Sequence, residues 1–258
     1  MSGRGAQWDD LAAELDLWGE AGRAARLWWR DDDAVAATPQ LHALLRLAGD
    51  VPLALAVIPA FARPELAAAL AGRPQVAVLQ HGWQHVNRAD NRGRKSEYPA
   101  GRAGAPVAAE IGAGRKRLRA LFGARALPVF VPPWNRFDDE FLTMLPAHGI
   151  AALSGMATPR LAAPRCPALP PGVALLNVHL DLAAWRGDRG FIGEAPALAA
   201  LLGRLRAQRC ASGIDERPIG ILTHHLILDC ATAGFIARLI ALSRSHRALR
   251  WAAVADLL

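Results

Sequence analysis

The chain has 258 residues, of which 52% are hydrophobic and 21% are charged, a balance typical of a folded globular protein rather than a disordered one. Its net charge of +7 comes from 30 basic residues, of which only two are lysines. The arginines are scattered and form no basic helix interleaved with aromatic residues, so we expect no nucleic-acid partner. Anionic small molecules stay possible as ligands.

Cysteine usage and hydropathy exclude two further classes. The three cysteines, Cys166, Cys210 and Cys230, have no Cys-x-x-Cys spacing, so we expect buried thiols rather than a disulfide framework or a structural zinc site. The N-terminus has no apolar stretch typical of a signal peptide, and the longest apolar run, 53–62, is too short to cross a bilayer. We therefore expect a cytoplasmic protein that does not bind a membrane. The sequence does not specify an oligomeric state.

Short apolar segments alternate with helical patterns along the chain. A helical extension is expected over about residues 1–25, and Thr38-Pro39 is typical of a helix start, with threonine as the N-cap and proline in the first turn. Because strands and helices alternate without a linker or repeat, we predict one domain over residues 1–258 with a parallel sheet, folded as a distorted, TIM-like (β/α)7 barrel. Strands are predicted at Arg26–Trp29, Leu53–Ile58, Gln75–Leu79, Pro128–Val131, Ile150–Leu153, Val173–Val178, Ile219–Leu222 and Leu249–Ala252. Further helices are predicted from Pro64, at Ile111–Phe122, Asp138–His148, Ala195–Gln208 and Ala231–Ser243.

The segment Val86–Val107 interrupts this alternation. It is rich in Arg, Gly, Asn and Ala and has few bulky apolar residues, so we expect a long loop. A surface insertion is one interpretation. Because the segment follows His85 directly, we favour a lid or substrate loop, with Lys95, Ser96, Glu97 and Tyr98 as its ordered part.

Polar residues follow the predicted strands where those strands end. In a β/α barrel the carboxyl ends of the strands form the active site, so we expect these clusters to converge there. The clusters are Asp31-Asp32-Asp33, His81 with His85, Pro132-Pro133-Trp134-Asn135, His179 with Asp181, and His224-His225.

A carboxylate and two imidazoles form a ligand set that leaves open positions on a metal ion, which is typical of a catalytic site. Zinc is the expected ion, and cobalt, iron or nickel would also fit. Such an ion polarises a carbonyl and acidifies its water, while a second aspartate can act as general base and a histidine as general acid.

These motifs resemble those of the polysaccharide deacetylases of carbohydrate esterase family 4, over about residues 26–228. The first family motif, Thr-Phe-Asp-Asp-Gly, is similar to 29–33, which implies Asp31 as general base, Asp32 as metal ligand and Asp33 in the glycine position. The second, His-Ser/Thr-x-x-His, matches His81 and His85 as ligands, with Gly82 in place of the hydroxyl residue.

The remaining three motifs match less closely. In the third, Val131 stands where the family has an arginine that steadies the base, and Arg30 or Arg136 is a candidate replacement. The residue whose backbone N–H holds the oxyanion in the family aligns with Trp134. Asp181 and Trp185 fit the fourth motif loosely. The fifth, Leu-x-His, implies His224 as general acid, with His225 as the alternative.

The resemblance implies a metal-dependent hydrolase of C–N bonds that removes an N-acyl group, such as N-acetyl, from a carbohydrate-like or other small-molecule substrate. Substrate contacts are expected from His225, Asp181, His179, Trp83, Asn135, Arg136 and Glu97. Two alternatives stay open. One is a metal amidase acting on a small non-sugar amide, and the other is a catalytically silent carbohydrate-binding relative. The tryptophans Trp8, Trp18 and Trp251 are expected in the core or an interface rather than as sugar platforms.

Overall fold

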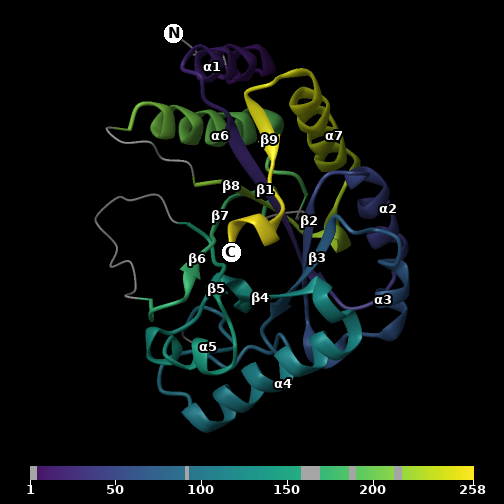
Figure 1. The fold of residues 1–258 in the computed structure, drawn as a ribbon, viewed down its shortest axis with the longest axis vertical. Coiled ribbons are helices and arrows are strands. Elements are labelled where there is room, and N and C mark those ends of the chain that lie inside the picture. Colours follow the sequence, from purple (N-terminus) through teal and green to yellow (C-terminus); the bar gives the residue numbers. More distant parts are fainter. Residues whose placement is uncertain (1–4, 91–92, 158–168, 186–189, 212–216) are drawn as a thin grey trace.

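A parallel sheet curls into a barrel at the centre of the molecule (Figure 1). The computed structural model describes residues 5–90, 93–157, 169–185, 190–211 and 217–258. Its strands form one nine-stranded sheet in the order β6-β5-β4-β3-β2-β1-β8-β7, with β9 beside β1. The strands are β1 Ala25–Ala34, β2 Leu53–Val57, β3 Val76–His81, β4 Ala126–Val131, β5 Ala152–Leu153, β6 Ala174–Leu175, β7 Val178–Asp181, β8 Ile219–Thr223 and β9 Leu249–Trp251.

The two ends of this sheet meet beside β7. The Val178 N–H donates to the Gly155 carbonyl oxygen at 2.9 Å, and the Ala157 N–H donates to the Val178 carbonyl oxygen at 2.8 Å. Residues 155–157 thus connect the β5 side of the sheet to β7. The predicted distorted, nearly closed β/α barrel is confirmed.

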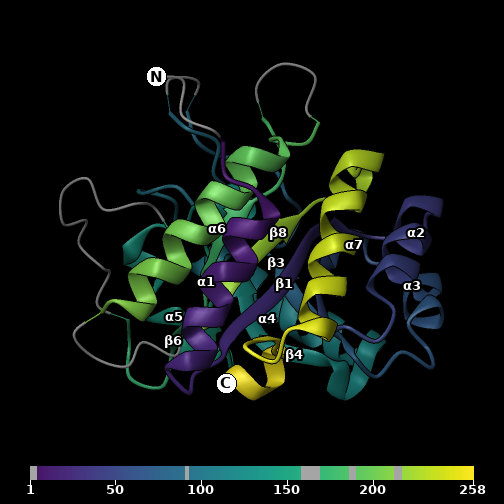
Figure 2. The ribbon, with the colours of Figure 1, turned by 90° about the horizontal axis from the view of Figure 1, so that it is seen from above.

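Helices cover the outside of the barrel (Figures 1 and 2). Thr38 caps α2 as predicted, because its Oγ1 accepts the Leu41 N–H at 3.1 Å, and Asp229 caps α7 by accepting the Thr232 N–H at 2.7 Å. None of the described helices is long and apolar enough to cross a membrane. The helices are α1 Trp8–Glu20, α2 Pro39–Ala48, α3 Pro64–Ala69, α4 Gly104–Phe122, α5 Met144–Ala147, α6 Glu194–Arg209 and α7 Cys230–Ser245, with short 3-10 turns at Pro59–Phe61, Gly123–Arg125, Pro133–Asn135, Asp139–Phe141, His225–Ile227 and Val254–Leu257.

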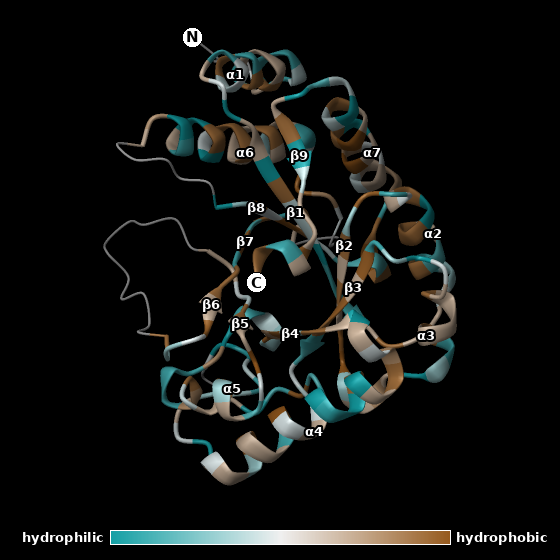
Figure 3. Ribbon diagram, viewed as in Figure 1, coloured by the Kyte–Doolittle hydropathy of each residue, from teal (hydrophilic) through white to brown (hydrophobic). Residues whose placement is uncertain are grey.

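Strands β3 and β4 consist mostly of hydrophobic residues, as the hydropathy colouring shows, whereas β1 is hydrophobic in one part and hydrophilic in another (Figure 3). Because side chains alternate along a strand, β1 sends Leu27 and Trp29 to the core beneath the helices and Trp28 to a second core inside the barrel. Val254, near the C-terminus, belongs to the same inner core. The inner core also contains Ala54, Ala56, Leu79, Val129, Val131, Ala152, Leu176, Val178 and Leu222.

Three elements differ from the prediction. Strand β1 continues to Ala34, so the three aspartates lie within the strand and not in a loop after it. The strand expected at Val173–Val178 is two strands, because β6 pairs with β5 and β7 pairs with β8. The helix expected at Asp138–His148 is reduced to a 3-10 turn and α5, which includes Pro146, a residue without an N–H to donate.

The predicted burial is correct for the tryptophans and wrong for the described cysteines. Trp8 and Trp18 are buried and Trp251 is half-buried against the core, as expected. Cys210 and Cys230 are exposed, so the prediction of buried thiols is wrong for both. Cys210 is the C-cap of α6 and Cys230 is the first residue of α7. Cys166 lies outside the described residues.

Candidate metal centre

Strand β1 presents its polar residues to opposite sides of the sheet. Alternation places Arg30 and Asp32 on the same side as Trp28, inside the barrel, and Asp31 on the outer side with Trp29. All three polar side chains are buried. Adjacent aspartates in one strand therefore have different surroundings.

Asp33 breaks the alternation because a bulge turns its side chain. The pairing of β1 with β2 changes register between Asp31 and Ala34, and Asp33 has a φ of 72°, which is uncommon for a residue other than glycine. Bulges re-aim side chains in this way and occur often beside active sites. The Asp33 Oδ1 lies 3.2 Å from His81 Nε2 and 3.3 Å from His85 Nε2.

The two histidines lie at the carboxyl end of β3. His81 is the last residue of the strand and faces inward like Leu79, whereas His85 follows a turn and has a φ of 57°. The two histidines thus lie on a strand end and on the loop after it. His81 Nδ1 lies 3.0 Å from the Val131 carbonyl oxygen, a contact in which Nδ1 is the donor and which leaves Nε2 as the ligand atom.

Asp33, His81 and His85 form a group that could hold a metal ion. One ligand atom of each lies within 4.8 Å of the others. A carboxylate with two imidazoles suits zinc and also cobalt, nickel or iron. Asp32 is not in this group, so the structure brings Asp33 to the histidines where the sequence analysis expects Asp32.

The charges of this group favour an anionic carboxylate and a neutral second imidazole. Burial acts to raise the pKa of Asp33, but the hydrogen bond with His81 and the positive charges of His81, His85 and His224 hold it below its usual range. Burial and the neighbouring His81 lower the pKa of His85. Asp33 and His85 are thereby in the protonation states that bind a metal ion. Burial acts to lower the pKa of His81, but the carboxylates of Asp32 and Asp33 raise it above its usual value, so a bound ion would have to displace a proton from His81.

Arg30 is fully buried and forms an ion pair with Asp32. Its Nη2 donates to Asp32 Oδ2 at 3.0 Å, and its Nε lies 2.8 Å from Asp32 Oδ1, an ion-pair contact without hydrogen-bond geometry. The same guanidinium donates to Asn135 Oδ1 at 2.6 Å and to Ser154 Oγ at 2.8 Å. Val131, where the family has its arginine, is buried in the inner core.

Asp31 belongs to a separate network on the outer side of the sheet. It lies 2.6 Å from His225 Nδ1 and accepts the Thr223 hydroxyl at 2.6 Å, and Trp29 Nε1 donates to that hydroxyl at 2.8 Å. Burial acts to lower the pKa of His225, but the Asp31 carboxylate raises it. Asp31 and His225 thus pair with each other, and the structure does not bring Asp31 to the histidines of the metal group.

His224 faces the other way, toward the metal group. Its Nδ1 lies 3.9 Å from Asp181 Oδ1, and its ring meets the Trp185 ring edge-on with centroids 4.6 Å apart. Trp185 Nε1 donates to Asp181 Oδ2 at 2.6 Å. Burial raises the pKa of Asp181 above its usual value, although the hydrogen bond from Trp185 and the charge of His224 act to lower it.

The remaining predicted site residues are spread around this centre. The Trp134 ring lies over His85 with centroids 4.3 Å apart, and Trp134 and Asn135 both have a φ of 56°. Together with Asp33 and His85 they are the non-glycine residues of positive φ in the described chain, so two of the four belong to the metal group and Trp134 contacts it through His85. Arg136 Nη1 donates to the Lys95 carbonyl oxygen at 2.8 Å. His179 Nδ1 accepts the Gly220 N–H at 2.9 Å, which places it in the sheet.

The segment after His85 packs against the site. Of the part expected to be ordered, 95–98, Ser96, Glu97 and Tyr98 are buried and Lys95 is exposed. Glu97 accepts the N–H groups of Trp83 and Gln84.

Two contributors were missed in the sequence. Ser154 directly follows the predicted strand Ile150–Leu153, so the strand-end rule that selected the other residues applies to it as well. Thr223 directly follows the predicted strand Ile219–Leu222 and is the last residue of β8 in the structure. Its hydroxyl contact to Asp31 depends on which side of β8 it faces.

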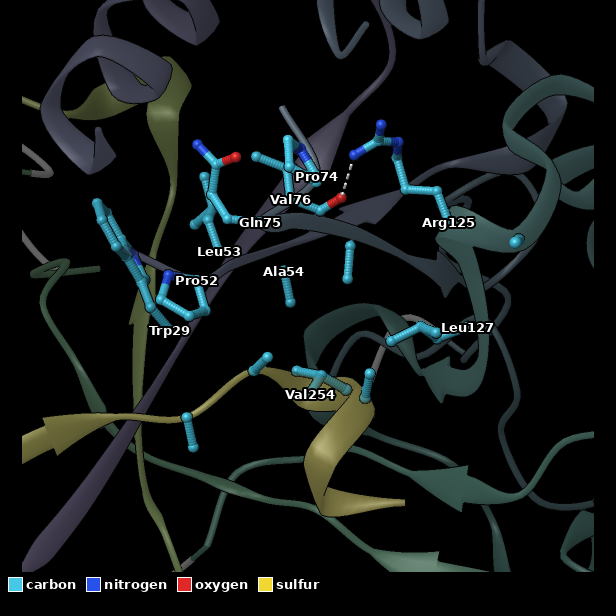
Figure 4. Close-up of a pocket in the computed structure, with 15 residues that line it drawn as sticks. Trp29, Pro52, Leu53, Ala54, Pro74, Gln75, Val76, Arg125, Leu127 and Val254 are labelled. Carbon is cyan, nitrogen blue, oxygen red and sulfur yellow. Dashed lines mark hydrogen bonds between the residues drawn. The ribbon is translucent and has the colours of Figure 1, made fainter. Parts of the chain in front are cut away.

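A pocket of about 370 Å³ lies at the opposite end of the barrel (Figure 4). It is lined by the first residues of β2, β3 and β4, including Leu53, Val76 and Leu127, and by the chain around Val254. Because the metal group lies at the carboxyl ends of the strands, this pocket is not part of it.

Comparison with known proteins places the fold. No protein-family model and no curated protein matches the sequence. Among solved structures, a putative polysaccharide deacetylase from Mycobacterium smegmatis is 17% identical, with a TM-score of 0.61 over 100% of this chain and 93% of its own. A family 4 acetyl xylan esterase from Clostridium thermocellum, solved with a cobalt ion, is 12% identical (TM-score 0.55, 90% and 89% covered). A chitin deacetylase from Colletotrichum lindemuthianum is 14% identical (TM-score 0.54, 92% and 88% covered).

These proteins share one fold, that of the family 4 carbohydrate esterases and deacetylases. This chain has the same fold over nearly its whole length. The family resemblance that the motifs indicate is therefore confirmed for the fold.

Proposed function

We propose that this protein is a divalent-metal-dependent hydrolase that removes an N-acyl group, such as N-acetyl, from a carbohydrate-like substrate. The observation that carries the proposal is the convergence of three sets of residues at one end of the barrel. They are the Asp33, His81 and His85 group, the Arg30-held carboxylate of Asp32, and His224 beside Asp181.

In this proposal Asp33, His81 and His85 hold the metal, with zinc or cobalt as the expected ion. When bound, the ion supplies a Lewis acid for the amide carbonyl and lowers the pKa of coordinated water. The bulge at Asp33 shifts the roles of the aspartates by one residue relative to the motif alignment. Asp33 takes the ligand role first assigned to Asp32, and Asp32 takes the base role first assigned to Asp31.

Asp32 would accept the proton of the attacking water. Arg30 places a positive charge beside the Asp32 carboxylate and fixes its orientation, as a positioned general base requires. The structure thus offers a replacement for the family arginine at the position of Val131, which supports an active enzyme over the silent relative.

His224 would protonate the departing amine. Asp181 lies on its Nδ1 side, so the Nε2 atom is the one free to deliver a proton. His225 contacts Asp31 on the other face of the sheet. We therefore assign His225 no contact with substrate. The backbone N–H of Trp134, next to His85, is proposed as the oxyanion donor.

Metal removal and a substrate panel test the proposal. The protein is stripped with a chelator, reloaded with zinc or cobalt, and assayed for acetate release from N-acetylglucosamine oligomers, with ureides and small acyl-amines as the comparison set. We expect acetate release that requires the ion and is specific to the sugar amides. Turnover of only the small amides would contradict the carbohydrate assignment, and oligomer binding without turnover of any substrate would contradict the hydrolase.

A further inference from the structure

A buried carboxylate lies beneath the turn that joins the two metal-group histidines. Glu97 is 0% exposed, and its Oε1 and Oε2 accept the N–H groups of Gln84 and Trp83 at 2.7 and 3.1 Å. Within the described residues, no ion pair is formed by this carboxylate. The nearby Arg102 guanidinium pairs with Glu110 and reaches only the Glu97 backbone oxygen. The described hydrogen-bond donors to the Glu97 carboxylate are therefore the backbone N–H groups of the turn.

The Glu97 carboxylate fills the space that a side chain at position 82 would need. A Cβ atom at position 82 would lie 2.1 Å from Glu97 Oε2 and 2.6 Å from Pro133 Cγ, and Gly82 has a φ of 53°. The turn therefore has no room for a side chain at position 82. Glu97, brought in from the segment after His85, fills the position with a carboxylate.

We infer that Glu97 is a positioning residue for the proposed metal site, holding the 82–85 turn so that His81 and His85 face one ion. The inference rests on the proposed function, because it assumes that these histidines bind the metal. Two adjacent N–H groups bound to one carboxylate fix the direction of the turn between the ligands. This matters because His85 has the left-handed backbone conformation that a non-glycine residue rarely adopts without support.

Burial supports a dedicated role for the carboxylate. An acidic side chain is rarely fully buried without a compensating partner. Among the described residues, only the N–H groups of the turn offset the cost of burying the Glu97 carboxylate. The same turn carries His85, the second histidine of the metal group.

Cobalt binding gives a test that does not depend on turnover. Glu97→Ala, Glu97→Gln and wild type are titrated with Co²⁺, with affinity measured by calorimetry and ligand geometry by the visible absorption of the bound ion. We expect Glu97→Ala to weaken Co²⁺ binding about 10- to 100-fold and to alter the spectrum, as losses of supporting contacts do at metal sites. Glu97→Gln keeps one acceptor oxygen but sets an NH₂ group against the other N–H, so its affinity should fall between the two.

Glu14 offers a matched control. It is a buried glutamate in α1 whose Oε1 lies 2.6 Å from Arg209 Nε, far from the metal group in the fold. Glu14→Ala should lower the unfolding temperature while leaving Co²⁺ affinity and the spectrum unchanged. A general loss of stability is thereby separated from a loss of positioning.

The outcomes separate the inference from the proposed function. If wild type binds no Co²⁺, the proposed function fails. If wild type binds one ion and Glu97→Ala binds it with the same affinity and spectrum, the inference alone is overturned. If Glu97→Ala does not fold, Glu97→Gln decides, and unchanged binding by that variant overturns the inference.

Discussion

The Arg30 guanidinium lies against the Asp32 carboxylate inside the barrel, with Nε 2.8 Å from Oδ1 and Nη2 3.0 Å from Oδ2. Both residues belong to β1 and are two positions apart, so they face the same side of the sheet. We propose that Arg30, from the strand that carries the aspartate itself, takes the role of the arginine that the family has at the position of Val131. Asn135 and Ser154 hold the far side of the guanidinium and restrict its movement.

Substitution of Arg30 tests this replacement. Arg30→Lys keeps a positive charge but cannot reproduce both contacts with Asp32, so we expect kcat to fall by about tenfold to a hundredfold with a smaller change in KM. Arg30→Met leaves the buried Asp32 charge unpaired and should lower the free energy of unfolding by about 3–5 kcal/mol. Kinetics at saturating metal and urea unfolding measure the two effects. Wild-type kcat in Arg30→Lys would exclude a positioning role.

Exchanging the aspartates one at a time tests the proposed shift in their roles. Asp33→Ala should lose bound metal, because it removes the carboxylate that contacts both histidines. Asp32→Asn keeps the shape of the side chain and should retain metal while turnover falls about a hundredfold or more. Metal content per chain and kcat are measured on the same samples. Retention of metal by Asp33→Ala together with its loss in Asp32→Asn would restore the original alignment.

The two adjacent histidines should respond differently to substitution. His224→Ala removes the proposed proton donor and should lower kcat about a hundredfold or more. His225→Ala leaves the buried Asp31 without its partner, so we expect a loss of about 3–5 kcal/mol in unfolding free energy and near wild-type turnover in the folded fraction. The comparison is made below the unfolding temperature of His225→Ala. The reverse pattern would make His225 the acid.

The sequence predicted the barrel and the end of it that carries the site because both depend on local patterns. Apolar segments mark the strands, and polar residues after them mark the carboxyl ends. The motif spacing also selected both histidines of the metal group. None of these features requires knowledge of a particular side chain's direction.

The roles of the three aspartates could not be read in the same way. They depend on where β1 ends and on the bulge at Asp33, and each is a tertiary effect of pairing with β2 and β8. A shift of one residue in a strand reverses the side to which a side chain points. The choice between His224 and His225 likewise needed the partner that each one meets, Asp181 or Asp31.

Asp229 makes the stability of α7 depend on pH. Its carboxylate caps the helix by accepting the N–H of Thr232 at 2.7 Å, and it also accepts the N–H of Phe191 at 3.2 Å. These hydrogen bonds, led by that of Thr232, lower the pKa of Asp229 in the folded protein. Since the folded pKa lies below the unfolded value of about 3.9, the added stability is present above that pH and is lost as the pH falls through the folded pKa.

Asp229→Asn provides the control for this effect, because asparagine also caps helices but does not titrate. Asp229→Ala removes the cap and should lower the free energy of unfolding by about 1 kcal/mol at neutral pH. Urea unfolding at pH 6 and pH 3 should show the wild type losing stability relative to Asp229→Asn as the pH falls. A wild-type advantage over Asp229→Asn that stays constant between the two pH values would show that the Asp229 charge does not contribute through this cap.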